Sequence, residues 1–312
     1  MFEIRKYVAA DAPSWNAHMA ESKNGTFLAD RRYVEYHGDR FSDFSLLCFL
    51  DGRLYAVLPA NRDGDTLLSH AGLTYGGLIV GADARTAATL QLFREIGLWL
   101  RQQGIRRVVY KPAPWIYHTM PAEEDLYAIV EACQARLTGR KVSAAVALGN
   151  PAKWQRDRRY AANKAERNGL ATEWSNDWPT FWQMLERHLA EKYDAHPVHT
   201  LQEMQLLASR FPENIRLYAA RLAGEMVGGT VVYLTREVAH TQYIASTEEG
   251  RRAHAIDLIF RRLMSDELPN ARYFDFGTSM NPDGHSLCQS LIYQKEGFGG
   301  RAVCYDTYEW EL

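Results

Sequence analysis

The first half of the chain combines short apolar runs with one long amphipathic stretch. Two of the apolar runs flank the turn signal Asp51-Gly52, and this pattern predicts a β-hairpin. The long stretch carries apolar residues at helical spacing and ends at Gly104, a residue suited to the left-handed position after a helix. We therefore expect antiparallel strands, a long helix and a further strand. These elements are expected at residues 44–50, 54–59, around 67, 85–103 and 108–110.

The second half repeats this order of elements with a clearer pattern. Two helical segments come first, and two apolar runs joined by Ala223-Gly224-Glu225 follow, then a third run, a one-sided helix and a last strand. The expected helices lie at residues 181–193, 201–211 and 256–263, and the expected strands at 216–222, 226–235, 238–245 and 273–276. The chain is thus predicted to be of the α/β (α+β) class, with related domains at 1–150 and 151–312.

The composition is that of a globular protein. Of the 312 residues, 46% are hydrophobic and 24% are charged, a balance that argues against disorder and allows one large domain or two ordinary ones. The 36 basic and 38 acidic side chains leave a net charge of -2. This charge excludes a protein that binds nucleic acid over its whole surface, so any polyanion must meet a local basic patch.

The ends and the cysteines point to an ordinary cytoplasmic protein. Residues 1–6 lack the order of a signal peptide, and no apolar run reaches the roughly 18 residues of a membrane span. The four cysteines are scattered and contain no CxxC pair, so we expect free thiols rather than a disulfide or a metal site. They are Cys48, Cys133, Cys288 and Cys304.

The segment Pro151–Asn168 is the candidate basic patch. It holds six basic and two acidic side chains, a local charge of +4. A solvated helix face explains such a run, and so does a surface that meets phosphates, where Arg and Lys are effective. The sequence leaves both interpretations open.

Several segments resemble a known superfamily. Three strands that feed a helix, with a strand after it, resemble the GNAT acyltransferase core, and two such units in tandem resemble its FemABX-like branch. The segments 159–170 and 291–299 are similar to that branch, the second reading Leu-Ile-Tyr-Gln-Lys-Glu-Gly-Phe-Gly. Segments 111–118 and 121–127 resemble bacterial GNAT-related proteins described as acetyltransferase-like. The resemblance implies two GNAT-like subdomains, each a mixed, mostly antiparallel sheet flanked by helices.

The resemblance also implies acyl transfer to an amine. GNAT enzymes take the acyl group from acyl-CoA, whose pyrophosphate meets the amides at a helix start, whereas Fem-type relatives take an aminoacyl group from charged tRNA. That helix start is expected at 247–255, which makes Gly250, Arg251 and Arg252 the candidate cofactor-binding residues. Thr247 stands where the family pattern has Gln or Arg, and Arg252 where it has a small residue. A solvent-exposed turn is the alternative interpretation.

One histidine of the second half is a candidate for proton removal. An attacking amine must be neutral, and histidine can take its proton near neutral pH. Among the 10 histidines, His199 precedes Thr200, which with Glu203 forms a capping box at a helix start. The box explains its own two members and leaves His199 as a candidate catalytic residue.

The first half offers candidate substrate-binding residues on two loops. The glycine-bearing loop 69–77 contains His70 and Tyr75, and the loop after the strand at 108–110 is fixed by two prolines. Loops at strand ends often carry binding residues. A plain tight turn explains the glycines equally well. The candidates are His70, Tyr75, Lys111, Tyr117 and His118.

Two strands of the second half add further candidates. Gln242 and Tyr243 occupy the strand that lines the acyl donor in GNAT folds, and alternation allows only one of them to face the cleft. Asp275 ends the following strand between aromatic residues, where an unpaired carboxylate is costly to bury. We expect it either to have a partner such as arginine or to lie at the cleft.

Lys295 is the first candidate catalytic residue. The resemblance to the Fem-type segment implies that it touches the anionic part of a substrate, and an ammonium can stabilise an oxyanion or neutralise a phosphate. Gln294 replaces the aromatic residue of that segment. A simple ion pair with Glu296 is the alternative.

The sequence therefore predicts an N-acyltransferase whose halves flank a cleft, with the donor site on the second half. The expected donor is acyl-CoA and the expected acceptor an amine of a cell-envelope precursor, such as a sugar nucleotide, or of a small metabolite; no metal is expected. Two alternatives remain: a Fem-type aminoacyltransferase that uses tRNA, and a non-catalytic binding protein that kept the fold.

Overall fold

The chain folds into two compact units. The structure, a computed structural model, describes residues 1–38, 40–193 and 195–312. Unit 1 comprises Met1–Lys141 and Cys304–Leu312, and unit 2 comprises Val142–Val303. Strands β9 (Arg136–Ala147) and β15 (Arg301–Glu311) each continue from one unit into the other. The chain thus leaves unit 1 within a strand rather than at residue 150, and its last strand returns to unit 1. An uninterrupted strand carries no turn signal, so the hydropathy pattern does not mark this crossing.

Unit 1 builds its elements around two sheets. One sheet has the order β1-β3-β4-β7, and the other contains β15-β8-β6-β5-β2. The strands are β1 (Phe2–Lys6), β2 (Ser42–Asp43), β3 (Leu46–Leu50), β4 (Arg53–Leu58), β5 (Asn61–Asp63), β6 (Thr66–Leu68), β7 (Ile79–Val80) and β8 (Arg107–Tyr110). The helices are α1 (Ala12–Glu21), α2 (Arg31–Val34), α3 (Thr86–Gln102) and α4 (Glu124–Cys133).

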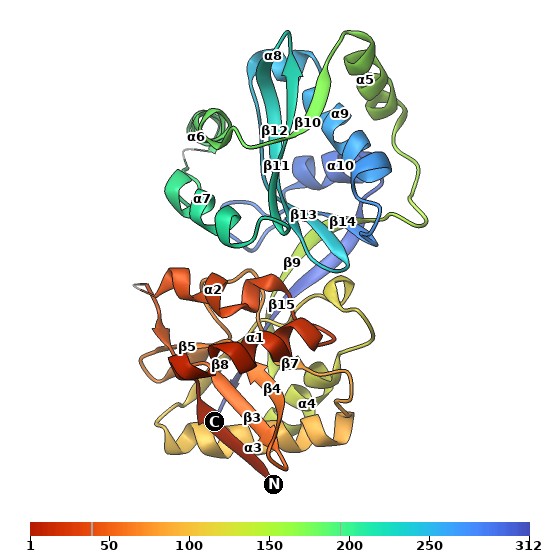
Figure 1. The fold of residues 1–312 in the computed structure, drawn as a ribbon. Helices are drawn as coiled ribbons and strands as arrows, with labels where there is room; N and C mark the ends of the chain where they lie inside the picture. Colours follow the sequence, from red (N-terminus) through yellow and green to blue (C-terminus); the bar gives the residue numbers. More distant parts are fainter. Residues whose placement is uncertain (39, 194) are drawn as a thin grey trace. The chain divides into compact units, whose positions relative to one another are not determined.

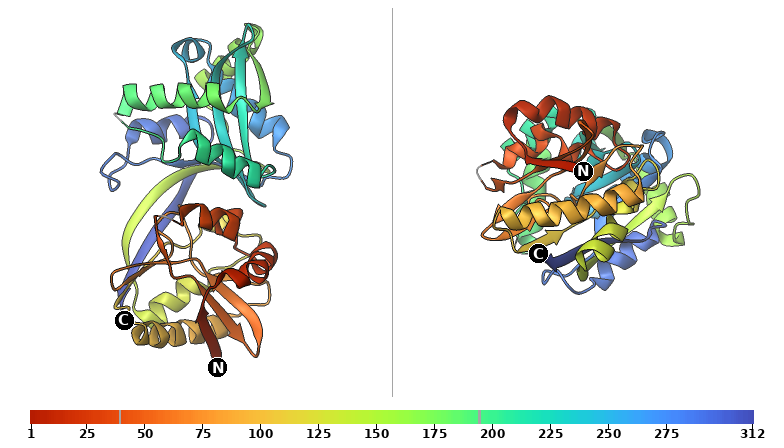
Figure 2. Two further views of the ribbon diagram at one scale, coloured as in Figure 1. Left: turned by 60° about the vertical axis from the view of Figure 1, so that its left-hand side comes forward. Right: turned by 90° about the horizontal axis from the view of Figure 1, so that it is seen from below.

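Helix α3 carries the expected apolar stripe and closes the core of unit 1. Its residues Leu92, Phe93, Ile96 and Leu100 are buried against β3, β4 and β8. Helix α4 packs beside it, as Figure 2 shows. The hairpin predicted at Asp51-Gly52 is present as β3 and β4, with both turn residues at positive φ.

Unit 2 is one mixed sheet covered on both faces. The strand order is β10-β11-β12-β13-β14-β9, antiparallel except for the parallel pair β13 and β14. The strands are β10 (Ala171–Ser175), β11 (Ile215–Leu222), β12 (Glu225–Leu234), β13 (Val238–Ser246) and β14 (Tyr273–Thr278). The helices are α5 (Arg156–Arg167), α6 (Trp178–Tyr193), α7 (Leu201–Arg210), α8 (Glu248–Arg252), α9 (Ala255–Arg262) and α10 (Gln289–Gly297).

The helices of unit 2 lie on opposite sides of the sheet. Helices α6 and α7 contact one face of β11–β13, while α9 lies on the other face with α5 outside it (Figure 1). An aromatic group formed by Phe260, Phe274, Phe276 and Phe298 fills the space under α9. The predicted α/β class with mostly antiparallel sheets is confirmed. Within the described residues, none of the helices has the length and apolar composition needed to cross a lipid bilayer.

A buried hydrogen-bonded pair links strand β8, helix α4 and the residue before β7 in unit 1. The Tyr110 hydroxyl donates to Asp125 at 2.5 Å and accepts from the backbone N–H of Leu78 at 2.6 Å. Both side chains are buried, and burial raises the pKa of Asp125 to about 6. The tyrosine hydroxyl therefore satisfies a carboxyl group and a backbone amide that have little access to water.

We predict that Tyr110→Phe lowers the free energy of unfolding by about 1–3 kcal/mol, because it leaves a buried carboxyl and a buried N–H without their shared partner. Chemical denaturation measures this change. The matched control Tyr127→Phe alters an exposed tyrosine of α4 and should stay within about 0.5 kcal/mol of the wild type. Equal stability of the two variants would contradict this role of Tyr110.

Candidate active site

Strands β13 and β14 separate after a short parallel pairing. Their register ends where His240 faces Asp275, although β13 continues to Ser246 and β14 to Thr278. Gly277 follows at φ +75°, a left-handed conformation that suits glycine. We call this separation the fork. Since diverging strands leave backbone groups without ladder partners, a fork is a natural place for a ligand to meet the sheet.

Asp275 lies at the base of the fork and is completely buried. Its carboxylate accepts hydrogen bonds from the Ser143 hydroxyl and from the Gly277 N–H at 2.9 Å, and it lies 3.2 Å from Nδ1 of His240. The sequence suggested an arginine partner or a place at the cleft. The residues that hold this carboxylate are a hydroxyl, an amide and an imidazole. The carboxylate, fixed in this way, orients the imidazole of His240, whose side chain is 15% exposed.

Lys295 reaches the same place from helix α10. Its ammonium donates to the carbonyl oxygens of Gly277 and Thr278, both at 2.8 Å, and its side chain is buried. Burial lowers the pKa of Lys295 to about 8, and the nearby Asp275 carboxylate opposes part of that shift. The alternative of a simple ion pair with Glu296 is not what the structure has, because Glu296 is exposed while the ammonium points to the end of β14.

The fork thus brings together the imidazole of His240, the carboxylate of Asp275 and the ammonium of Lys295. We call Ser143, His240, Asp275, Gly277 and Lys295 the fork cluster. If Nδ1–H of His240 donates to the carboxylate, Nε2 is the basic nitrogen. The ammonium retains one N–H beyond the two it gives to the carbonyls. These groups can accept a proton and stabilise a developing negative charge.

His199 and Tyr243 meet each other a short distance along β13. The Tyr243 hydroxyl lies 2.6 Å from Nδ1 of His199 and accepts its backbone N–H at 3.3 Å. The ring of Trp182 packs edge-on against Tyr243. His199 also lines a pocket of about 640 Å³ with residues of α6. The structure therefore joins two predicted site residues that lie far apart in the sequence.

Gln242 departs from the alternation assumed for β13. Val231 of β12 faces Tyr243 and the adjacent Val232 faces Thr241, so Gln242 forms a β-bulge. A bulge re-aims the side chains next to it, so simple alternation does not by itself assign Gln242 and Tyr243 to opposite faces.

The expected cofactor-binding turn is largely occupied by its own side chains. The Thr247 hydroxyl accepts the N–H of Gly250 at 3.0 Å, and Arg251 donates to the Ser246 carbonyl. Arg252 pairs with Glu248, both exposed. A Cβ at Gly250 would lie 1.9 Å from the carbonyl oxygen of Val227, so glycine is required for packing. This turn resembles a capped helix start more than an open phosphate cradle.

The candidates of unit 1 lie together but pack into the protein. The centres of the Tyr75 and Tyr117 rings lie 4.7 Å apart with a tilt of 45°, and the hydroxyls of Tyr117 and Tyr305 share a hydrogen bond of 2.9 Å. His70 and His118 are buried, the latter against the Ala113 carbonyl. Of the loop glycines, Gly76 would place a Cβ 2.4 Å from the Ser69 carbonyl oxygen, so close packing accounts for it.

Lys111 is the more accessible of these candidates. Its ammonium donates to the Leu73 carbonyl at 2.9 Å. Burial and the neighbouring charge of Lys141 lower its pKa to about 8. Among the described residues, no group of His, Cys, Asp and Glu side chains is arranged to hold a metal ion.

Sequence reasoning missed His240 and Ser143. Both lie on strands far from Asp275 in the sequence, and each reaches Asp275 only through strand pairing with β14. The one available signal was Asp275 itself, since a buried carboxylate on an apolar strand requires partners on the neighbouring strands.

The fold and the fork define a class of protein. Residues 152–284, within unit 2, match the family model described as an acetyltransferase (GNAT) domain. Among curated proteins, none matches the chain in sequence. Among solved structures, FemX superposes with a TM-score of 0.72 at 12% identity, over 99% of this chain and 97% of that one.

Two further structures show the same architecture. L-PGS from Bacillus licheniformis superposes with a TM-score of 0.61 at 14% identity, over 98% of this chain and 92% of that one. A tandem GNAT protein from the clavulanic acid biosynthesis pathway gives 0.52 at 14% identity, over 100% and 98%. Residues 152–284 of unit 2 are thus similar to a GNAT acetyltransferase domain. The whole chain has the tandem, FemABX-like fold of the GNAT superfamily, as its sequence resemblance predicted.

The lowered pKa of Lys295 predicts a pH-dependent contribution to stability. Between pH 8 and 10.5 the unfolded chain binds more protons at this lysine than the folded chain does. This group therefore makes the free energy of unfolding rise with pH in that window, by at most about 1.4 kcal/mol per pH unit. Denaturant titrations of the wild type and of Lys295→Met should differ by this slope. Glu296→Gln, on the same helix, should keep the wild-type slope, and a Lys295→Met protein that does so too would contradict the buried ammonium.

Proposed function

We propose that the protein is an N-acyltransferase whose chemistry takes place at the fork of unit 2. The observation that carries this proposal is the buried Lys295 ammonium at the end of β14, beside the His240 and Asp275 pair. The GNAT domain match supports acyl transfer as the reaction class. The amine of the acceptor attacks the carbonyl carbon of an ester or thioester directly, so no covalent enzyme intermediate is needed.

His240 is proposed as the general base. Asp275 holds its Nδ1, and Nε2 then takes a proton from the nitrogen of a neutral acceptor amine as that nitrogen attacks. A new carbon–nitrogen bond forms, and the tetrahedral oxyanion collapses by breaking the bond to sulfur or oxygen. The proton held on Nε2 passes to that leaving group, so the imidazole returns to its starting state.

Lys295 is proposed to stabilise the oxyanion. Its two bonds to β14 carbonyls fix the ammonium, and a fixed donor needs no reorganisation when negative charge develops. Because burial already disfavours the ammonium, the oxyanion would be its strongest partner. His199 and Tyr243 are proposed to position substrate further along β13.

The identity of the donor depends on helix α8. The Gly250 N–H is one of the groups that would otherwise bind a pyrophosphate, and it donates to the Thr247 hydroxyl instead. Glu248 and Glu249 add negative charge at the same turn. Acyl-CoA, the donor implied by the superfamily, would have to bind here with fewer amides than usual.

A specific observation favours an aminoacyl ester of tRNA as the second candidate donor. In the described chain, the basic residues Lys153, Arg156, Arg159, Lys164 and Arg167 form no ion pair. Tyr160 between them is 61% exposed and could stack on a base. An uncompensated basic helix with an exposed aromatic ring suits a nucleic-acid backbone.

The acceptor is proposed to be an amine of a cell-envelope precursor or of a small metabolite.

The transfer reaction tests the fork cluster. With acetyl-CoA or alanyl-tRNA and a panel of amino sugars and amino acids, Lys295→Met should lower turnover at least about 100-fold, a loss expected for an oxyanion donor. Release of CoA thiol or of uncharged tRNA gives the rate. Glu296→Gln, an exposed change on the same helix, should leave it unchanged. Full activity of Lys295→Met would refute the assignment of this lysine.

The pH profile gives a sharper readout. Activity should fall as the pH rises through about 8, because the ammonium of Lys295 loses its proton there. Lys295→Arg keeps a permanent charge, so any residual activity should lack this alkaline decline. An unchanged decline in the arginine variant would assign it to another group.

Binding separates the two donors. Affinity for alanyl-tRNA should fall steeply with salt, and Arg156→Gln with Arg159→Gln should weaken it at least about tenfold. Arg187→Gln, an exposed arginine on α6, is the matched control. Acetyl-CoA binding that raises the unfolding temperature and ignores both changes would instead identify acyl-CoA as the donor.

A further inference from the structure

Unit 2 contains a pocket on the opposite edge of its sheet from the fork. The pocket has a volume of about 430 Å³ and lies between β10, the start of β11 and helix α7. In the strand order, β12 and β13 separate β11 from β14, so this pocket is distinct from the fork cluster. The residues that matter here are Trp174, Asn176, Trp178, Gln205, Ser209 and Arg216.

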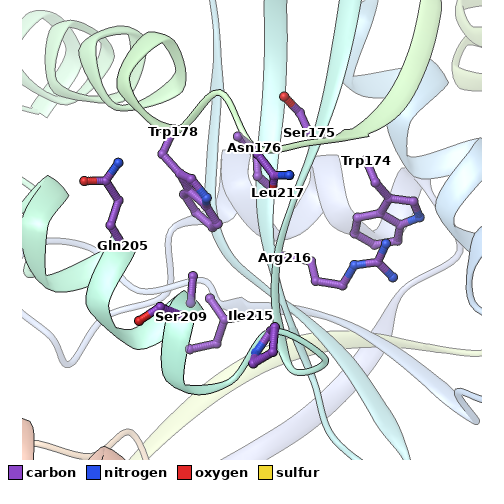
Figure 3. A pocket seen from close by; sticks show the side chains of 11 residues that line it. Trp174, Ser175, Asn176, Trp178, Gln205, Ser209, Ile215, Arg216 and Leu217 are labelled. Atoms are coloured by element: carbon purple, nitrogen blue, oxygen red, sulfur yellow. The ribbon is translucent and has the colours of Figure 1, made fainter.

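Arg216 is held flat beside the pocket by Trp174. Its guanidinium carbon lies 3.8 Å from the centre of the indole ring, and Figure 3 shows the two side chains against each other. Trp174 is itself fixed, because Tyr218 packs edge-on against it and its indole N–H donates to Glu267 at 2.8 Å. The guanidinium is therefore pre-oriented by a rigid aromatic support.

The described residues supply no ion-pair partner for the charge of Arg216. Arg221 on the same strand, by contrast, pairs with Glu173 and Asp177. Glu267 is the nearby carboxylate, and its oxygens accept from Trp174 and from Tyr218. A half-buried, immobilised guanidinium with its donors available is a strong recognition element for a carboxylate or phosphate.

The remaining wall of the pocket suits a flat ring with polar edges. Trp178 presents an indole from the first residue of α6, and the described lining residues include no acidic side chain. Asn176 and Gln205 supply amide groups, while the Ser209 hydroxyl already donates to the Leu206 carbonyl at 2.7 Å. Few polar groups around an apolar wall, in a cavity of this size, is the usual composition of a small-molecule site.

We propose that this pocket binds a small organic anion whose phosphate or carboxylate is carried by a flat ring. The anion pairs with Arg216, the ring packs against Trp178, and Gln205 bonds its polar edge. A nucleoside monophosphate and an aromatic carboxylate share this chemistry. The site is separate from the fork, so this inference does not depend on the proposed acyl transfer.

Isothermal titration of the full chain tests the proposal with adenosine 5′-monophosphate and with 4-hydroxybenzoate. At least one should bind, and Arg216→Gln should weaken that binding about tenfold or more, while Arg221→Gln changes it less than about twofold. Adenosine, which has the ring without the anion, should bind at least about tenfold more weakly than its monophosphate. The probe that binds identifies the source of the anion.

A second variant guards against a loss of folding. Gln205→Ala changes an exposed residue of α7 and should weaken the same ligand severalfold with an unchanged unfolding temperature. The proposal is overturned if neither probe binds, if adenosine binds as tightly as its monophosphate, or if a folded Arg216→Gln protein keeps the wild-type affinity.

Discussion

The bonds between the Lys295 ammonium and the carbonyls of Gly277 and Thr278 are the interaction on which the account of this protein depends. They bring the end of β14 and helix α10 together at the point where β13 turns away. A buried ammonium is costly unless its donors are satisfied, so the separation of the two strands and the position of the helix are coupled through one side chain.

The residues after Lys295 explain how the ammonium is kept in place. Phe298 is buried and packs against Trp154, Phe260 and Phe276. Gly299, at φ +87°, would place a Cβ 2.5 Å from the Ala152 carbonyl oxygen. The Gly-Phe-Gly segment that marked the family resemblance is therefore a packing device that fixes the end of α10. Lys295 precedes this segment on α10, so its position is fixed as well, as the proposed oxyanion donor requires.

Local patterns were sufficient to predict strands β3, β4, β6, β8 and β11–β14, helices α3, α6, α7 and α9, and the α/β class, because periods of 2 and 3.6 residues report which face of an element is buried. Lys295 and Asp275 were also identifiable, the first from its segment and the second as a carboxylate on an apolar strand. His240 was not, because its role arises from strand pairing with β14 rather than from its neighbours in sequence. Gly250 and Tyr75 were predicted as binding residues, and the structure places them in close packing, since glycine and aromatic residues serve both purposes. The long strands β9 and β15 escaped prediction because their partners lie far along the chain.

The most direct measurement of the central claim is nitrogen-15 NMR of the Lys295 side chain, titrated in the free protein and with acetyl-CoA or alanyl-tRNA added. We expect a pKa near 8 in the free protein, and a rise when the donor places its polarised carbonyl oxygen beside the ammonium. An ordinary pKa near 10.5 that neither donor changes would contradict the assignment of the fork as the reaction site.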